Sequence, residues 1–289
     1  MTTDAGAPVQ HTEMDAERAV AQTEQTAISS TTLVRSEVAD HIGTLYLDNG
    51  AKRNALSHAL LDEVMLTLEG FKAQGVRVVI LRSAPGHSVW SSGHDIRELR
   101  ADHGDPLGYA NPLERTLRAI RAFPAPIIAM VHGTVWGGAV DLVLSCDMIV
   151  ADDSASFAIT PVNIGLPYNT TGLLHFLGRL PLNLIKEMFF TAAPIKAEEA
   201  SRWGLVNYLV KEEELDSFTH TLATGIAMKA PLAIAVVKEQ LRVLTDFQPI
   251  AAQVFERIQD MRREVFDSHD FQEGLQAFLE KRKPVFRGE

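Results

Sequence analysis

Two glycine-containing turns hold the residues of this sequence that are best placed to do chemistry. One covers residues 91–95 (S-S-G-H-D) and the other residues 133–139 (G-T-V-W-G-G-A). Each lies between a predicted strand and a predicted helix, whose first backbone N–H groups lack a partner within the helix and attract negative charge. Glycine lets the backbone approach a ligand closely. Two such N–H groups that converge on one carbonyl oxygen form an oxyanion hole.

Each turn also has a purely structural interpretation, as a glycine that allows a strand to lead into a helix. One turn alone does not decide between the two interpretations. Neither turn contains the G-x-G-x-x-G pattern of dinucleotide-binding folds or the G-K-[ST] ending of a phosphate-binding loop. The sequence therefore gives no support to nucleotide binding.

The elements around the turns follow from hydrophobic periodicity. Short β-rich runs at 33–38 and 42–47 predict a hairpin, and Ser57 is a predicted N-cap. Strands that alternate with helices predict a mainly parallel sheet. The strands are expected at 76–81, 90–93, 127–131, 148–151 and 206–210, and the helices at 58–73, from about 95, at 112–122, 139–145, 171–178, 181–190, 196–203, 213–229, 231–245, 250–266 and 268–281. The expected architecture is an α/β core followed by a helical tail.

Composition bounds the class of protein. The 289 residues are 46% hydrophobic and 22% charged, which is typical of a globular enzyme or binding protein. The net charge of −10 argues against general binding of nucleic acids or anionic membranes, which favour basic surfaces. The single cysteine, Cys146, allows no internal disulfide.

The ends and apolar segments of the chain give further expectations. Residues 1–30 are rich in Thr, Ala, Gln, Glu and Ser, which predicts a disordered N-terminal extension without a signal peptide. The longest apolar stretch, residues 126–151, is interrupted by His132, Asp141 and Asp147 and is expected to be a buried strand, turn and helix rather than a membrane span. A cytoplasmic location is the default expectation.

Five segments in this order resemble the crotonase (enoyl-CoA hydratase/isomerase) superfamily, over residues from about 32 to the end. They are R-N-A-L at 53–56, S-S-G-H-D at 91–95, I-I-A-M-V-H-G-T-V-W-G-G-A-V-D-L-V-L-S-C-D at 127–147, the segment 200–206, and F-L-E-K-R-K-P at 278–284. The resemblance implies an α/β fold, a ClpP-like spiral of ββα units with a C-terminal helical trimerisation region. The implied divisions are the extension 1–30, a core with the active site at 31–225, and a C-terminal helical region at 226–289.

The resemblance also implies site residues and partners. The N–H groups of His94 and Gly138 are expected to bind a thioester oxygen, and Lys281 to meet the CoA phosphates, unless it is only part of a solvated helix end. The expected catalytic residues are His94, Gly138 and Tyr168, and the expected substrate- or CoA-binding residues are Arg53, Ala55, Leu56, Ser92, His94, Asp95, Ile96, Gly138, Thr160 and Lys281. The implied assembly is a homotrimer or a dimer of trimers. No metal, nucleic acid, membrane or separate cofactor is expected, because coenzyme A enters as part of the substrate.

The acid–base residues that surround the hole set the reaction within this superfamily. Its hydratases use two glutamates, because adding water across a double bond needs a general base and a general acid. The first glutamate position holds Asp141 here, and the segment that supplies the second reads T-P-V-N from Thr160. One carboxylate is shortened and the other is absent, which disfavours hydration.

The segment from Thr160 to Asn169 resembles that of superfamily members that decarboxylate methylmalonyl-CoA. Decarboxylation to propionyl-CoA needs no base, since the electrons left by CO2 enter the thioester and form an enolate that the two N–H groups stabilise. A site poor in carboxylates suits this reaction. Tyr168 is expected to hold the departing carboxylate out of the thioester plane, and Thr160 to line the pocket.

Alternatives remain open at this stage. Tyr168 can instead be a wall residue, the His94 imidazole can be uninvolved, and Asp141 can be a packed residue or a proton relay. The whole chain can also be a hydratase or isomerase that uses Asp141, or a decarboxylase of a related malonyl-CoA. A non-catalytic relative that binds acyl-CoA or RNA is a further alternative, although the net charge of −10 disfavours RNA.

Overall fold

The computed structural model describes residues 1–2, 32–99, 108–246 and 251–289. The chain divides into Met1–Thr32 and a compact unit, Leu33–Glu289, and only the second is described below. The predicted extension over residues 1–30 lies outside the described residues except for Met1 and Thr2. The predicted boundary between core and C-terminal region, at 225/226, falls in the last turn of α8 (Leu215–Ala227) and stays a prediction.

The larger sheet begins with the predicted hairpin. Its two-residue turn, Asp40 and His41, has φ angles of 51° and 63°, as a tight hairpin turn requires. The sheet has the order β1-β2-β3-β5-β7-β10, antiparallel between β1 and β2 and parallel from β2 onward. The strands are β1 Val34–Ala39, β2 Ile42–Leu47, β3 Val78–Ser83, β5 Ile127–Val131, β7 Met148–Asp152 and β10 Tyr208–Val210.

A smaller sheet holds the strands from which the two glycine turns emerge. Its order is β4-β6-β8-β9, where β4 is Val89–Ser91, β6 Thr134–Trp136, β8 Ser156–Ala158 and β9 Ile195–Lys196. The turn predicted over residues 133–138 is wrong in part, because its middle forms β6, and β8 and β9 were not predicted. The chain passes from β3 to β4, from β5 to β6 and from β7 to β8, alternating between the sheets. The predicted ββα spiral is confirmed.

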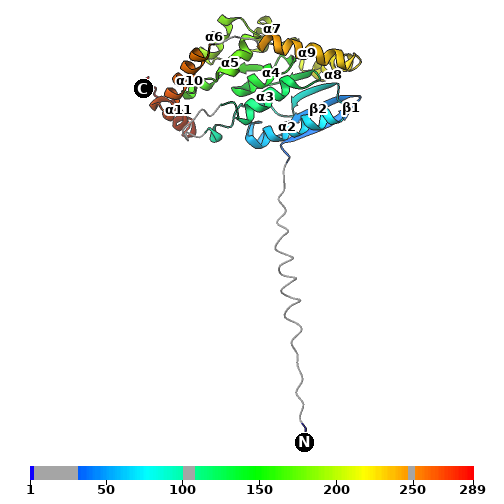
Figure 1. The fold of residues 1–289 in the computed structure, drawn as a ribbon, viewed down its shortest axis with the longest axis horizontal. Coiled ribbons are helices and arrows are strands. Elements are labelled where there is room, and N and C mark those ends of the chain that lie inside the picture. Colours follow the sequence, from blue (N-terminus) through cyan, green and yellow to red (C-terminus); the bar gives the residue numbers. More distant parts are fainter. Residues whose placement is uncertain (3–31, 100–107, 247–250) are drawn as a thin grey trace. The chain divides into compact units, whose positions relative to one another are not determined.

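Helices cover both faces of the larger sheet, as Figure 1 shows. On β3, Val79 and Leu81 join the core shared with α2 (His58–Ala73), α3 (Pro112–Ala122) and α4 (Gly138–Ser145), while Val78 and Ile80 pack with α8. This alternation follows from the two-residue period of a strand. Ser57 caps α2 as predicted, and its side chain accepts a hydrogen bond from the Leu60 N–H.

The second half of the chain is mostly helical, as predicted. Its helices are α5 Thr170–Leu177, α6 Leu182–Thr191, α7 Ala197–Arg202, α8, α9 Pro231–Asp246, α10 Ala252–Phe266 and α11 His269–Leu279. Short 3-10 helices are η1 Gly50–Lys52, η2 Ile96–Glu98, η3 Pro161–Ile164 and η4 Glu212–Glu214. Within the described ranges no single helix is long and apolar enough to cross a membrane; only a pair bent by 104°, Glu212–Ala227 with Pro231–Asp246, has the required length and composition.

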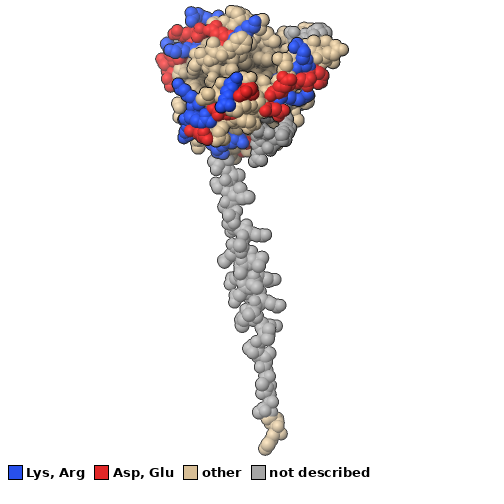
Figure 2. All heavy atoms as spheres, turned by 90° about the vertical axis from the view of Figure 1, so that its left-hand side faces the viewer, with Lys and Arg blue, Asp and Glu red and all other residues tan. Residues whose placement is uncertain are grey.

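Charges of both signs are mixed on the face that carries α10 and α11 (Figure 2). The basic C-terminal cluster is part of this mixture, since Arg282 forms ion pairs with Glu273 and Glu280 at 2.6 Å each. On the described part of this face, basic side chains are interspersed with acidic ones, in keeping with the acidic net charge.

Candidate active site

The two glycine turns meet because their strands are parallel neighbours. β4 pairs with β6 with Ser91 opposite Val135, so the carboxyl ends of both strands lie at the same edge of the smaller sheet. A Cβ added at Gly93 would lie only 2.4 Å from the Trp136 carbonyl oxygen and 3.1 Å from the Gly138 nitrogen. Gly93 also has a φ of +84°, so a glycine is required here for two reasons.

The N–H groups of His94 and Gly138 border a common space. A Cβ added at Gly138 would lie 3.8 Å from the His94 nitrogen, and Gly138 is the first residue of α4, where the helix leaves its N–H without an internal partner. Among the described residues, neither N–H donates a hydrogen bond to the protein. The pair can therefore bind one carbonyl oxygen from two sides, as an oxyanion hole does.

A small cavity opens beside these N–H groups. Its volume is about 40 Å³, room for very few atoms. The residues that line it are His94, Leu99, Asn111, Leu113, Glu114, Gly138, Asp141, Pro161, Leu166, Tyr168 and Asn169. The structure thus brings together all three predicted catalytic residues, His94, Gly138 and Tyr168, with Asp141.

Asp141 is buried between two hydrogen-bond donors. The Tyr168 hydroxyl donates to Oδ2 at 3.0 Å, and His175 Nδ1 lies 2.7 Å from Oδ1. Gly172 leaves room for this contact, since a Cβ there would lie 2.4 Å from the Tyr168 ring and 2.9 Å from Asp141 Oδ2. Burial, followed by the charge of Asp141, raises the pKa of the Tyr168 hydroxyl well above its ordinary value. The hydroxyl therefore keeps its proton and can donate a hydrogen bond as a neutral group.

Glu114 is a second buried carboxyl group in the cavity, and the sequence did not reveal it. It lies on α3, where Asn169 Nδ2 donates to its Oε1 and Arg118 approaches its Oε2 at 3.8 Å. Burial raises the pKa of this carboxyl, and the Asp141 charge adds to the increase, which favours the neutral form. The expectation of a carboxylate-poor site is wrong as to residue types. The expectation of little negative charge in the site holds in part, because hydrogen bonds and burial reduce the negative charge that the two carboxyl groups expose.

His94 is half-buried, with its Nδ1 shielded from solvent, and this burial lowers the pKa of its imidazole to about 4. The unfolded chain, with a pKa near 6.5, therefore takes up this proton first as the pH falls. Lowering the pH from 7 to 4 should reduce the free energy of unfolding by roughly 3 kcal/mol through this group alone.

Urea unfolding of the chain and of His94→Gln at pH 7, 5.5 and 4 measures this effect. The variant lacks the group, so it should lose less stability over the same range. Parallel losses in the two proteins would contradict a lowered pKa of His94 in the folded chain.

The R-N-A-L segment is tied directly to the first turn. Ser92 N–H donates to the Arg53 carbonyl at 2.9 Å, and Leu56 N–H donates to the Gly93 carbonyl at 2.8 Å. The buried Asn54 side chain links the segment further to β3 and β4, donating to the Ser83 hydroxyl and the Trp90 carbonyl at 2.9 Å each. Arg53 itself is exposed, and Ala55 and Leu56 are buried. The segment therefore sets the position of the oxyanion turn.

Of the predicted substrate- and CoA-binding residues, only His94 and Gly138 line the cavity. Asp95 turns its carboxylate to the Arg97 guanidinium, at 2.7 Å, and Ile96 follows it in η2. Thr160 lies beside Gly137, with its hydroxyl 3.6 Å from where a Cβ of residue 137 would be. Lys281 comes after α11. Neither Thr160 nor Lys281 lines the cavity as described.

Helix α11 of the same chain packs against the segment that leads to Tyr168. A Cβ added at Gly274 would lie 2.2 Å from the Ile164 carbonyl oxygen, so the helix backbone rests directly on η3. Phe271 is buried in a small core with Leu166 and Phe266. Within the described ranges, no three His, Cys, Asp or Glu side chains come together to hold a metal ion.

The fold and the oxyanion hole formed by backbone N–H groups are typical of a class of thioester-binding proteins. Comparisons with known proteins agree with this class. The enoyl-CoA hydratase/isomerase family model matches residues 37–289. Methylmalonyl-CoA decarboxylase of Escherichia coli strain K12 is 47% identical over 247 residues, which cover 86% of this chain and 95% of that protein. Carnitinyl-CoA dehydratase of Shigella flexneri is 36% identical, over 74% of this chain and 82% of that one.

A solved structure of methylmalonyl-CoA decarboxylase with 2S-carboxypropyl-CoA is also similar. It superposes with a TM-score of 0.88 at 45% identity and covers 90% of this chain and all of that one. The chain belongs to the enoyl-CoA hydratase/isomerase family. The resemblance drawn from the five sequence segments is confirmed.

Proposed function

We propose that this chain decarboxylates methylmalonyl-CoA, or a close malonyl-CoA analogue, to propionyl-CoA and CO2. The observation that carries the proposal is the pair of free N–H groups of His94 and Gly138 at one small cavity with Tyr168. The 47% identity to the E. coli decarboxylase supports the choice of substrate.

The chemistry follows from where negative charge moves. The bond between the α-carbon and the carboxylate breaks, CO2 leaves, and the electron pair passes into the thioester to form an enolate. The charge thereby shifts to the thioester oxygen, which the N–H groups of His94 and Gly138 bind more strongly as its charge grows. The α-carbon then takes up a proton to give propionyl-CoA. Preorganised backbone donors of this kind act mainly on the transition state.

Hydration of an enoyl-CoA is the main alternative, and the hydrogen bonds of Asp141 argue against it. A general base needs a free oxygen directed at water, but one oxygen of Asp141 accepts from Tyr168 and the other meets His175. Glu114 is held by Asn169, and burial raises its pKa toward the neutral form, which cannot accept a proton. The site therefore suits a reaction without a base.

Incubation of the chain with two different thioesters separates decarboxylation from hydration. We expect methylmalonyl-CoA to yield propionyl-CoA and CO2, measured by chromatography of the CoA products, and crotonyl-CoA to remain without added water. Rapid hydration of crotonyl-CoA would overturn the proposal. Tight binding of both thioesters without turnover would identify a non-catalytic acyl-CoA-binding protein instead.

The proposal includes the residues that bind the CoA part. Arg53, Ala55, Leu56, Ser92, Asp95 and Ile96 lie on the two segments that are hydrogen-bonded to each other beside the hole. Thr160 belongs to the acyl side, and Lys281 would act on the phosphates, from the same or a neighbouring subunit. No cofactor other than the CoA of the substrate takes part, and the proposed location is the cytoplasm.

The proposed assembly is a homotrimer or a dimer of trimers. Helix α9 has no buried residue, and it exposes six large apolar side chains: Leu232, Val236, Val237, Leu241, Val243 and Leu244. Apolar surface of this kind is normally covered in an oligomer. Sedimentation equilibrium should give three or six times the 31.8 kDa mass of the chain, and a monomer at micromolar concentration would contradict this assembly.

A further inference from the structure

Tyr168 has one proton to donate but two groups that need it. In the structure the hydroxyl donates to Asp141 Oδ2 at 3.0 Å. A substrate carboxylate in the cavity needs a donor as well, and Tyr168 lines that cavity. A phenol hydroxyl donates only one hydrogen bond. When it turns toward the substrate, Asp141 therefore loses a partner.

Asp141 is too deeply buried to lose a partner without consequence. Only 1% of the residue is exposed, and a buried carboxylate that lacks hydrogen bonds is strongly unfavourable. The remaining donor is His175, whose Nδ1 lies 2.7 Å from Oδ1. A carboxylate only accepts, so His175 donates this hydrogen bond in the tautomer that carries its proton on Nδ1. This contact, between helices α4 and α5, holds Asp141 whichever way Tyr168 points.

We propose that His175 is a positioning residue for decarboxylation, an inference that rests on the proposed function. It anchors Asp141, and Asp141 holds the Tyr168 hydroxyl at the cavity until that hydroxyl turns to the substrate carboxylate. His175 itself is not among the residues that line the cavity beside the oxyanion hole. Its effect on the reaction passes through Asp141 and Tyr168.

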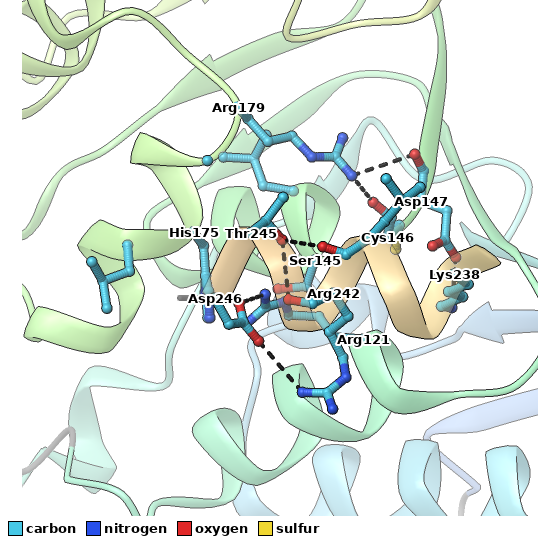
Figure 3. A pocket seen from close by; sticks show the side chains of 14 residues that line it. Arg121, Ser145, Cys146, Asp147, His175, Arg179, Lys238, Arg242, Thr245 and Asp246 are labelled. Atoms are coloured by element: carbon cyan, nitrogen blue, oxygen red, sulfur yellow. Dashed lines mark hydrogen bonds and ion pairs between the residues drawn. The ribbon is translucent and has the colours of Figure 1, made fainter. Parts of the chain in front are cut away.

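The surroundings of His175 leave it free for this task. Its ring also lines a second cavity, of about 220 Å³, beside the carboxyl end of α4 (Figure 3). The four cations there have other partners. Arg179 donates to the carbonyls of Cys146 and Asp147, and Lys238 pairs with Asp147. Arg121 and Arg242 both pair with Asp246. Within the described part of the chain, His175 and Tyr168 are the two side chains bonded to Asp141.

Three substitutions test the position of the shared proton. Asparagine places an amide nitrogen near the site of Nδ1, glutamine places it near Nε2, and leucine removes the donor. We expect His175→Leu to lower kcat on methylmalonyl-CoA about tenfold, with KM changed less than about twofold. His175→Asn should restore most of kcat, and His175→Gln should not. Loss of kcat in His175→Asn equal to that in His175→Leu would overturn the proposal.

A double-mutant cycle with Tyr168→Phe separates positioning from general structural support. If His175 acts through the Tyr168 hydroxyl, His175→Leu should change kcat by less than about twofold once that hydroxyl is gone. An equal loss in both backgrounds would show that His175 only supports the fold, and thermal unfolding of each variant reports that directly. An unmodified chain that fails to decarboxylate methylmalonyl-CoA would overturn the proposed function together with this inference. Unchanged kcat in His175→Leu, with an active unmodified chain, would overturn the inference alone.

Discussion

Gly138→Ala should lower kcat on methylmalonyl-CoA by about 10²–10³-fold, the loss expected when an oxyanion hole is disabled. The added Cβ would lie 3.8 Å from the His94 nitrogen and 2.8 Å from Leu113 Cδ2, and so at the space where the thioester oxygen binds. The end of the Leu113 side chain can shift, and residue 138 has no left-handed φ, so the fold should persist. The transition state, which carries the most charge on that oxygen, should be affected most.

A matched glycine supplies the control. Gly70 on α2 has open space around the position of a Cβ, and Gly70→Ala should keep full activity. Steady-state kinetics of both variants, with thermal unfolding to verify the fold, measures the difference. A fully active Gly138→Ala would remove this N–H from the mechanism.

Tyr168→Phe should lower kcat by about 10²-fold while leaving the affinity for propionyl-CoA nearly unchanged. The raised pKa of Tyr168 keeps its hydroxyl protonated, so the group that is lost is a neutral donor to a carboxylate. Propionyl-CoA has no such carboxylate and does not use the donor. The ring keeps its edge-to-face contacts with Phe176 and Phe189, at centroid distances of 5.9 and 5.0 Å, so packing should change little.

Tyr208→Phe provides the comparison, because Tyr208 lies on β10 and packs on Phe218, away from the residues that line the cavity. Its kcat should equal that of the unmodified chain. Competitive inhibition by propionyl-CoA gives the affinities. Undiminished turnover by Tyr168→Phe would reduce Tyr168 to a wall residue.

The parts of the fold that were predictable from sequence depend on local signals. A few neighbouring residues determine each of three such features: the φ-positive turn at residues 40–41, the Ser57 cap and the apolar period of α3. β6 was missed because its three residues gain their strand conformation from pairing with β4 and β8, which are remote in sequence. Pairing of that kind has no local signature.

The residues of the candidate site likewise fall into a predictable group and a group that depends on packing. His94, Gly138, Asp141 and Tyr168 lie in segments that resemble a known family, so their meeting could be predicted. Glu114 and His175 come from helices α3 and α5, and their partners depend on how those helices pack. One signal was available for Glu114: it follows Leu113 on the side of α3 that carries Leu117 and Ile120, where a charged residue is unusual.

The close fit between Gly93 and the Trp136 carbonyl has a consequence for how this protein can change over evolution. The donors of the hole are main-chain atoms, which every amino acid except proline supplies, so a substitution removes them only by moving the backbone. Selection should therefore hold the small residues that allow this fit, such as Gly93, more strictly than the polar side chains around the cavity. Those side chains can be substituted one after another while the main-chain donors stay in place. The catalysed reaction can therefore change gradually while the oxyanion hole is kept.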